Sequence, residues 1–457
     1  MAFFTIHPIL KEIAVLFDTR GREMCLVGGA VRDILCGRKA KDWDLATDAS
    51  PQEVTNIFIN AQPRARVIPT GIRHGTVTVL YKGHNIEITT YRTEAGYSDG
   101  RRPDRVDYAA SIEEDLSRRD FTMNAVALRL PKGKKVDPFG GEVDIKARRI
   151  RCVGNPAQRF LEDGLRPLRA VRFAAQLSFN IEDQTLAAIG GVLEICAKVA
   201  MERVKDELEK IIASSKPSIA FLLMEETGLL ELFLPELAAC RGIEQKGFHH
   251  FDVLDHSLFA CDYAAKKGYP TEIRLAALFH DVGKAVTQNY DETGVSTFHQ
   301  HEIESARIAR NILVRLRFPN MLIDSVCHLV KEHMFHYTED WSDAAVRRFI
   351  TRIGKENLAS LYKLRRADSF AMDGSEFSHR FLLLLVDRVS KILAENQAFS
   401  LKDLAVSGRD LMAIGIAPGK NLGKILNELL ETVLDDPDLN SREDLLGIAE
   451  KLRDKFC

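Results

Sequence analysis

Two aspartates separated by one residue, Asp42 and Asp44 in the segment KDWDLATDAS, have the types and spacing to do chemistry. Side chains at positions i and i+2 of a strand point to one side, so we expect both carboxylates to project together while Trp43 and Leu45 face the core. Two carboxylates this close repel each other and need a cation. Mg²⁺ accepts such oxygens together with substrate phosphate oxygens, an arrangement suited to nucleotidyl transfer. The alternative is a polar loop in which the aspartates serve turns.

A third carboxylate, Glu87 in NIEITTYR, lies on a later predicted strand. Its neighbours Ile86 and Ile88 face the opposite side of that strand, so Glu87 is a candidate third catalytic acid beside the aspartate pair. A glutamate that only faces solvent is the alternative.

A glycine pair precedes the aspartates in LVGGAVRDILCG. A strand-like run leads into Gly28 and Gly29 and then into a helical segment, the context in which backbone N–H groups bind phosphate. Arg32 follows one turn later, where its guanidinium can reach the same anion. An ordinary tight turn would use the same glycines, and it is the nearby aspartates that favour a phosphate site.

Histidines are concentrated in the second half of the chain, where ten of the thirteen follow residue 248. His256, the pair His280–Asp281 and Asp368 occur in the order H, HD, D, which resembles the HD-domain phosphohydrolases. Histidine and aspartate ligands from several helices can hold Mn²⁺, Ni²⁺ or Mg²⁺ and activate water for phosphoester hydrolysis. His301 and His333 are candidates for a second ion. The alternative is a set of histidines that only cap and pack helices.

The elements that must position these residues change in kind along the chain. From about residue 20 to 150, β-rich runs such as RVIPTG, GTVTVLY and NIEITTYR alternate with turns and helical patches. After about residue 155 apolar residues recur at helical spacing, so roughly two thirds of the chain should be helical. We therefore predict an α+β head at 1–152, a helical neck at 153–215, a helical body at 216–400 and a helical tail at 401–457.

Composition limits the class of protein. The 457 residues are 46% hydrophobic and 28% charged, as in folded globular proteins, and at about 150 residues per domain they predict two to four domains. The formal net charge of −2 excludes a generally basic, histone-like binder but permits a local basic groove. Eight cysteines without a C-x-x-C pair argue against zinc knuckles and disulfides and favour a reducing cytoplasm. No signal peptide and no membrane span are expected.

Five segments occur in one order over about 150 residues: LVGGAVRDILCGRKAKDWDLATDA, PTGIRHGTVTV, YRTEAGYSDGRRP, DLSRRDFTMNAVAL and EDGLRPLRAVRFAAQLSF. Together they resemble the class II tRNA nucleotidyltransferases, the CCA-adding enzymes, and their relatives the bacterial poly(A) polymerases. The resemblance implies a polymerase-β-like nucleotidyltransferase head that adds C, C and A to the tRNA 3′ end from CTP and ATP and releases pyrophosphate. In it, Asp42 and Asp44 would hold Mg²⁺, and Gly28, Gly29 and Arg32 would bind the nucleotide phosphates.

The resemblance also implies roles further along the chain. The resemblance places Arg119, Asp120 and Asn124 near the ribose and triphosphate of the nucleotide. Base choice would rest with Asp163 and Arg166, because a carboxylate accepts from the exocyclic amino group of C or A and a guanidinium donates to the ring nitrogen.

The helix expected after this pair carries Arg169 and Arg172, which continue at three-residue steps and form a slanting stripe toward the phosphates or, alternatively, a solvated basic face. Proline is tolerated in the first turn, so Pro167 allows this helix to begin near Asp163, which could serve as its N-cap.

More than one activity is compatible with the sequence. The segment 94–103, with Arg101 and Arg102, has the composition of a mobile loop, which argues against a family member that adds only CC. An enzyme that adds only the terminal A would look nearly the same. The acidic tail disfavours a poly(A) polymerase. The intact aspartate pair counts against a phosphohydrolase with a degenerate head. It also disfavours a non-catalytic RNA-binding protein, because carboxylates repel RNA phosphate unless a cation is present. The basic runs 146–151 and 346–366 are either RNA contacts or solvated helix faces.

Overall fold

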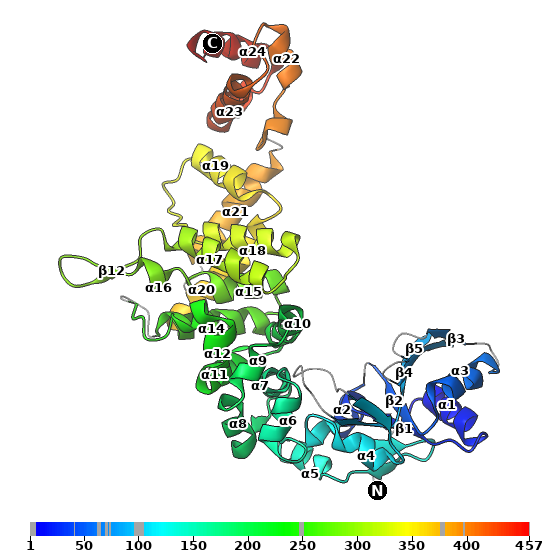
Figure 1. Cartoon of the computed structure of the whole chain (residues 1–457). Coiled ribbons are helices and arrows are strands. Elements are labelled where there is room, and N and C mark those ends of the chain that lie inside the picture. Colours follow the sequence, from blue (N-terminus) through cyan, green and yellow to red (C-terminus); the bar gives the residue numbers. More distant parts are fainter. Residues whose placement is uncertain are drawn as a thin grey trace. The chain divides into compact units, whose positions relative to one another are not determined.

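The computed structural model describes residues 6–40, 42–61, 65–68, 72, 75–95, 105–245, 251–374, 380–395 and 398–456. The chain divides into two compact units, Met1–Ala238 with Arg315–Phe318, and Ala239–Val314 with Pro319–Cys457. Figure 1 shows the sheet of the first unit in blue to cyan and the helices of the second in green to red. Among the described residues, no helix has both the length and the apolar character needed to cross a membrane.

A seven-stranded mixed sheet forms the centre of the described part of the first unit (Figure 1). Its strands lie in the order β3 (Arg66–Ile68), β4 (Thr76–Tyr81), β5 (His84–Thr90), β2 (Asp44–Thr47), β1 (Met24–Val27), β8 (Ala127–Arg129) and β9 (Lys134–Val136). The β2 and β5 strands are parallel, and the other neighbouring pairs are antiparallel. A separate hairpin joins β6 (Arg92–Ala95) to β7 (Arg105–Tyr108). The predicted α+β head is confirmed.

The two faces of the sheet differ in what covers them. One face packs against α1 (Pro8–Asp18) and α3 (Pro51–Ile59), and its core includes Leu26 and Leu45. The opposite face buries Val27 and Ala46 against α4 (Ile112–Ser117). Because strand side chains alternate, Asp44 points to this second face, while Trp43 packs against the first core as predicted.

Helices follow the sheet within the first unit. The short α2 (Gly29–Leu35) begins directly after the glycine turn, and η2 (Thr122–Asn124) and α5 (Gly141–Lys146) lie beyond α4. The remaining helices lie after residue 155: α6 (Pro156–Glu162), α7 (Arg166–Leu177), α8 (Asp183–Gly190), α9 (Leu193–Cys196), α10 (Met201–Ile212), α11 (Ser218–Thr227), α12 (Leu229–Phe233) and α13 (Pro235–Ala238). The two-residue strands β10 (Arg149–Ile150) and β11 (Asn180–Ile181) pair in parallel near α7.

The start of α7 differs from the prediction. The helix begins at Arg166, with Leu165 as its N-cap residue and Pro167 in the first turn, so Asp163 is not the N-cap. Asp163 instead ends α6, and its carbonyl accepts from the Arg166 N–H at 2.9 Å. The turn between the two helices is therefore held by Asp163 before α7 starts.

The described part of the second unit is helical apart from the short β12 (Asn289–Tyr290) and β13 (Ser296–Thr297). Its helices are α14 (Val253–Lys266), α15 (Thr271–Phe279), α16 (Lys284–Thr287), α17 (His301–Arg315), α18 (Asn320–Glu332), α19 (Asp343–Ile353), α20 (Leu358–Asp373), α21 (Arg380–Ala394), α22 (Gly408–Ala413), α23 (Lys420–Asp435) and α24 (Arg442–Phe456). The helices α22, α23 and α24 share a core of their own that includes Ile425 and Leu429. The predicted domain limits at 152, 215 and 400 stay predictions.

Candidate functional site

An open pocket of about 630 Å³ in the first unit gathers the head residues that the sequence singles out, apart from Glu87. A volume of this order suits a small ligand such as a nucleotide. The predicted residues that line it are Gly28, Gly29, Arg32, Asp42, Asp44, Arg119, Asp120, Asn124, Asp163, Arg166, Arg169 and Arg172. Sequence reasoning missed four further lining residues, Arg118, Phe173, Arg203 and Lys210.

The aspartate pair lies at the start of β2 and not wholly within it. Asp44 is the first residue of the strand, whereas Asp42 precedes it, so the expected strand through both residues is wrong in that detail. Both nevertheless line the pocket. Partial burial raises the pKa of the Asp44 carboxyl; the charge of Arg119 opposes this rise and that of Asp42 adds to it. A cation bound between the carboxylates would remove their mutual repulsion.

The glycine turn lies beside Asp44 because Val27, the last residue of β1, pairs with Asp44 across the sheet. Gly28 has φ +67°, a conformation that side chains rarely adopt. A Cβ at this position would lie 3.0 Å from Arg119 Nη1 and 3.4 Å from Asp44 Oδ2. Glycine is therefore required both by the backbone angle and by the closeness of the two charged groups.

Glu87 lies next to Asp44 on the adjacent strand. The parallel register pairs the two residues directly, and the flanking Ile86 and Ile88 are buried in the core on the opposite face. Glu87 is exposed and is not among the residues that line the pocket. Its role as a third carboxylate stays a prediction.

Arg119 is held in place by a buried acid that sequence reasoning missed. Asp115, on α4, is fully buried and accepts from Arg119 Nη2 at 3.1 Å and from Arg118 Nη2 at 2.9 Å. Burial tends to raise the pKa of Asp115, but the two guanidinium groups lower it below its ordinary value. The spacing of three and four residues along α4 is a signal that could have identified this anchor.

A continuous chain of hydrogen bonds crosses the pocket from α2 to α7. Arg32 Nη1 donates to Asn124 Oδ1 at 3.0 Å, and Asn124 Nδ2 donates to Asp120 Oδ1 at 3.0 Å. Arg169 then donates to Asp120 Oδ2 through Nε at 2.9 Å and Nη2 at 2.7 Å. Burial favours a higher pKa for Asp120, but Arg169 and Asn124 together hold it well below the ordinary value. Asp120 therefore stays ionised and fixes the arginine of α7 relative to the glycine turn.

The two predicted base-recognition residues are both in the pocket but are bonded to other partners. Arg166 is 8% exposed, pairs with Glu162 and donates to the Arg118 carbonyl at 3.2 Å. Asp163 accepts from Arg203 on α10. Between them in the chain, Gly164 has no room for a side chain, because a Cβ would lie 2.5 Å from the Ile195 carbonyl oxygen.

The third arginine of the α7 stripe, Arg172, pairs with Glu207 of α10, and both side chains are buried. Its guanidinium carbon also lies 3.7 Å from the centroid of the Phe173 ring. Burial and the nearby Arg169 lower the pKa of Arg172 to about 10, against the opposing charge of Glu207. The stripe is therefore not a solvated face, since each of its three arginines has a carboxylate partner.

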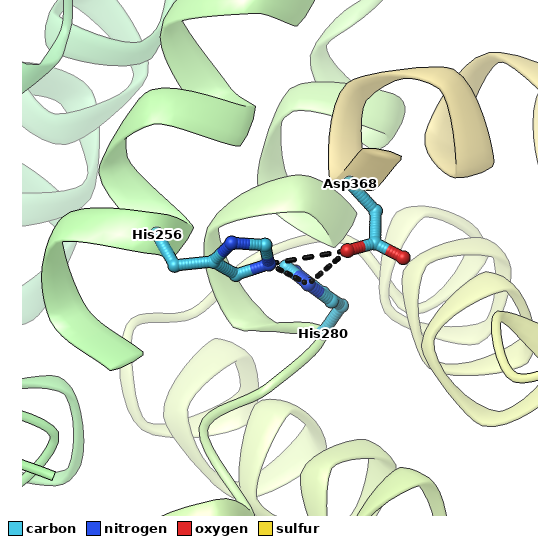
Figure 2. A group of neighbouring side chains, drawn as sticks. All are labelled: His256, His280 and Asp368. Carbon is cyan, nitrogen blue, oxygen red and sulfur yellow. Dashed lines mark hydrogen bonds and ion pairs between the residues drawn. The ribbon is translucent and has the colours of Figure 1, made fainter. Parts of the chain in front are cut away.

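A second cluster of titratable residues is buried in the second unit. Figure 2 shows His256 of α14, His280 at the end of α15 and Asp368 of α20 converging on one point. His256 Nε2 lies 3.1 Å from His280 Nε2 and 3.1 Å from Asp368 Oδ1. The ligand atoms of these three residues all lie within 4.8 Å of one another, close enough to share one metal ion.

Asp281 joins the remaining histidines to this group. Its Oδ2 lies 3.3 Å from His280 Nε2, and its Oδ1 lies 3.2 Å from His301 Nε2 and 3.6 Å from His333 Nε2. Lys284 Nζ lies 2.7 Å from Asp281 Oδ2 and also donates to Gln245 at 2.6 Å. All of the predicted body ligands are thus brought together around two carboxylates.

Hydrogen bonds fix the protonation of three of these imidazoles. The Nδ1 atoms of His280, His301 and His333 lie 2.9, 2.8 and 2.6 Å from the carbonyls of Ala277, Phe298 and Val330. A carbonyl can only accept, so each Nδ1 carries a proton and each neutral ring presents an Nε2 lone pair to the carboxylates. Lone pairs facing carboxylate oxygens require a cation or an extra proton between them, and a histidine set held in this way fits a metal ion.

The pKa values of the residues in the body cluster shift in different directions. Burial alone would lower the pKa of His280, but Asp281 and Asp368 raise it. Burial dominates for His333 and lowers its pKa. The two carboxyl groups, despite burial, have pKa values well below their ordinary range because of the surrounding cations and hydrogen bonds.

The basic run 346–366 is largely occupied with contacts inside the protein. Arg347 is 6% exposed and donates to the carbonyls of Leu434 at 2.7 Å and Asp435 at 3.1 Å. Arg348 pairs with Glu431 at 2.7 Å. These two arginines connect α19 to α23, although Arg348 is itself exposed, and an RNA contact by the run stays a prediction. The predicted loop 94–103, with Arg101 and Arg102, lies outside the described residues from residue 96 onward.

Family models match three successive parts of the chain: a "Poly A polymerase head domain" at residues 24–151, an "RNA and SrmB- binding site of polymerase A" at 178–241, and a "tRNA nucleotidyltransferase domain 2" at 293–449. The CCA-adding enzyme of Enterococcus faecalis is 31% identical over 449 residues, which are 98% of this chain and 96% of that protein. The CCA-adding enzyme of Lactobacillus helveticus is 33% identical over 453 residues, covering 98% and 97%.

Among solved structures, the Bacillus stearothermophilus CCA-adding enzyme in complex with CTP matches with a TM-score of 0.73 and 28% identity. The match covers 99% of this chain and 100% of that one. Fold, pocket and relatives along nearly the whole length agree with the family that the five sequence segments predicted, and the chain belongs to the CCA-adding enzymes, a family of nucleotidyltransferases.

Proposed function

We propose that the protein completes tRNA 3′ ends by adding C, C and A from CTP and ATP, with release of pyrophosphate. The observation that carries the proposal is one pocket that contains a carboxylate pair, several arginines and the Asp163–Arg166 pair. Carboxylates suit a metal-assisted transfer, arginines suit a triphosphate, and the last pair suits the Watson–Crick edge of C or A. No nucleic-acid template is needed, because protein groups select the base.

In this proposal Asp42 and Asp44 hold the metal, with Mg²⁺ as the ion, and Glu87 assists from the neighbouring strand. Mg²⁺ bound there would lower the pKa of the tRNA 3′ hydroxyl and stabilise the charge on the leaving pyrophosphate. The β1–β2 pairing brings Asp44 next to Gly28, so the residues that would hold the ion lie beside the glycine turn.

The phosphates of the nucleotide would lie against Gly29, Arg32 and Arg119. Arg32 and Arg119 line the pocket, and their side chains are oriented by Asn124 and Asp115 respectively. Arginines fixed in this way lose little conformational entropy when they bind an anion. Asp120, which Arg169 and Asn124 keep ionised, does not contact phosphate directly in this proposal but holds Arg169 and, through Asn124, Arg32 in position.

Three tRNA substrates test the head activity: one ending before CCA, one ending after C and one ending after CC, each supplied with CTP or ATP separately. Stepwise addition of C, C and A to the respective ends is expected. Addition of A only to the tRNA ending in CC would instead indicate an A-adding enzyme that needs a CC-adding partner, and open-ended A tails would indicate a poly(A) polymerase.

We propose a second activity, metal-dependent phosphoester hydrolysis, for the buried cluster of the second unit. The observation that favours it is the position of the Nε2 atoms of His280 and His301, which lie 3.2–3.5 Å from carboxylate oxygens of Asp281 and Asp368. His256, His280, Asp281 and Asp368 would hold one ion, and His301 and His333 with Asp281 a second. A bound Mn²⁺, Ni²⁺ or Mg²⁺ would activate water there. Removal of a 2′,3′-cyclic phosphate or a 3′-phosphate from RNA would supply the free 3′ end that the head extends.

Two variants separate the activities. Asp42→Ala should abolish nucleotide addition and leave hydrolysis, whereas His280→Ala should abolish hydrolysis and leave addition. Metal content of the purified protein, and hydrolysis of 2′,3′-cyclic and 3′-phosphate ends with added Ni²⁺, Mn²⁺ or Mg²⁺, provide the readouts. Absence of both metal and hydrolysis would end the second proposal without affecting the first.

The proposed place of action is the bacterial cytoplasm. This is supported by the free thiols of Cys25, Cys36, Cys152, Cys196, Cys240, Cys261 and Cys327, the cysteines that the structure describes.

A further inference from the structure

Arg203 forms a two-pronged contact with the carboxylate of Asp163. Arg203 Nη1 donates to Asp163 Oδ1 at 3.1 Å, and Nη2 donates to Oδ2 at 2.8 Å, although the two residues are 40 positions apart in the chain. The backbone N–H of Leu165 donates to Oδ1 at 3.0 Å. Asp163 and Arg203 both line the pocket, with side-chain exposures of 17% and 24%.

These contacts limit what Asp163 can still bind. An ionised carboxylate has roughly four acceptor positions, and three donors already occupy positions on Asp163, which leaves about one for a ligand. A planar guanidinium that binds both oxygens of a carboxylate also fixes the plane of that carboxylate. The direction of the remaining acceptor position on Asp163 is therefore fixed too. One N–H of an exocyclic amino group satisfies such a position. The O4 of uracil or the O6 of guanine would face it as a second acceptor.

A purely structural role for Arg203 is less well supported. The α10 helix is already fastened to α7 by the buried pair Arg172–Glu207, and Gln176 Nε2 of α7 donates to the Lys210 carbonyl of α10 at 3.4 Å. Arg203 therefore does not have to serve as the tie between the helices. Arg203 instead lines the pocket and directly contacts the Asp163 carboxylate, the group that faces the nucleotide in the proposed function.

We infer that Arg203 is a positioning residue for nucleotide selection, which holds Asp163 so that its one remaining acceptor meets the amino group of CTP or ATP. The inference rests on the proposed role of Asp163 in base recognition. Without Arg203 the Asp163 side chain can rotate, and its oxygens no longer favour one donor direction.

The test compares Arg203→Gln and Arg203→Lys with the unchanged full-length protein in single-nucleotide additions to tRNA. For Arg203→Gln, the ratio of kcat/KM for CTP over UTP, and for ATP over GTP, should fall about tenfold, mainly through KM for the correct nucleotide. KM for tRNA should not change. Arg203→Lys keeps the charge without the fork and should give an intermediate ratio.

Two further variants make the result decisive. Arg315→Gln removes another two-pronged arginine pair of the same unit, with Glu236 at 2.8 Å for both contacts, outside the pocket, and should leave selectivity unchanged. Asp163→Asn tests the underlying role of Asp163 in base recognition, because an amide presents a donor as well as an acceptor.

The outcomes distinguish the two proposals. Loss of selectivity in Asp163→Asn but not in folded Arg203→Gln or Arg203→Lys would overturn the inference about Arg203 alone. Unchanged selectivity in all three would overturn base recognition by Asp163 itself. An equal loss for all four nucleotides in the Arg203 variants would show a structural pair and also overturn the inference.

Discussion

Asp44 and Glu87 lie side by side in register across β2 and β5, the parallel strand pair of the described sheet. Residues paired in this way point to the same face, and the neighbours Ile86 and Ile88 are buried on the other. Glu87 is thereby the residue of β5 that can add a carboxylate to the aspartate pair. The sheet register, which no local sequence pattern specifies, is what gives this glutamate a candidate catalytic role.

Replacing Glu87 by Gln should therefore lower kcat about 10- to 100-fold, the range in which one positioned acid–base group contributes. KM for CTP should change little, because Glu87 does not line the nucleotide pocket. Glu113→Gln is a matched control on α4, where an amide oxygen can still accept from Arg129. Single-turnover rates measure the effect, and an unchanged kcat in Glu87→Gln would identify it as a solvent-facing residue.

Asp44→Asn should abolish addition and at the same time raise Tm slightly. The pKa of Asp44 is raised in the native state, so the native state holds this proton to a higher pH than the unfolded chain does. Stability is therefore lost as pH rises from the ordinary aspartate value through the raised one, and at pH 7 the ionised carboxylate is unfavourable. The amide removes that charge. Tm measured with and without Mg²⁺ should show a Mg²⁺-dependent rise in the unchanged protein and none in Asp44→Asn; a lower Tm in the variant would contradict the argument.

Local sequence pattern predicts the position of those residues whose placement depends on neighbours along the chain. The glycine turn, the Asp42–Asp44 spacing and the core positions of Trp43 and Leu45 follow from strand alternation and turn chemistry. Even here the strand boundary was misplaced by two residues, because Asp42 precedes β2. Strand ends depend on pairing with neighbouring strands, which periodicity does not contain.

Residues that act through distant partners were not predictable. Arg203 reaches Asp163 from α10, and Lys284 reaches Asp281 and Gln245 in the second unit. A charged residue on an amphipathic helix gives no signal of which carboxylate it will meet, since that depends on how helices pack. The order of His256, His280 and Asp368 did predict their convergence, but only because it matched a known pattern of ligands.

Arg169→Ala should destabilise the first unit by about 2 kcal/mol, which is less than the roughly 3–5 kcal/mol for breaking a fully buried ion pair, because Arg169 is partly exposed. Asp120 would remain buried without its paired arginine, and its direct donors would be the amide of Asn124 and the backbone N–H of Phe121. The lowered pKa of Asp120 means that this pair stabilises the protein above the ordinary aspartate pKa and that the contribution is lost as pH falls through the lowered value. Denaturant unfolding at pH 7 and pH 2 should show a smaller difference between the two proteins at pH 2. Equal stability at pH 7 would contradict the importance of the pair.

Gly164→Ala should raise KM for both CTP and ATP and destabilise the protein by about 2 kcal/mol. The added methyl would lie 2.5 Å from the Ile195 carbonyl oxygen, a backbone atom that cannot move away alone, so the Asp163 turn must shift. Gly190→Ala is the matched control, because this helical glycine of α8 has nothing within 4 Å of the added carbon. The control should be neutral or stabilised by about 0.5–1 kcal/mol. Equal effects of the two substitutions on KM would contradict the role assigned to the turn.

Binding of the metal ion held by His280 in the body cluster should release about one proton at pH 7.5. The neighbouring carboxylates outweigh burial and raise the pKa of His280 to about 10, so its Nε2 is protonated in the metal-free protein at this pH. That proton stabilises the metal-free state below the ordinary histidine pKa, and the contribution is lost as pH rises toward 10. A metal ion must displace it, so affinity for Ni²⁺ or Mn²⁺ should increase with pH.

Isothermal titration calorimetry in buffers of different ionisation enthalpy measures this proton directly, as a slope of about one between the observed and the buffer enthalpies. His328→Gln should retain both binding and the slope, because His328 contacts the Ile353 carbonyl at 2.8 Å and is not a member of the cluster. His280→Gln should lose the tight binding and the proton release together. Metal binding with a slope of zero would mean that no proton is released when the ion binds. It would show that His280 Nε2 carries no proton in the metal-free protein, which would contradict the prediction.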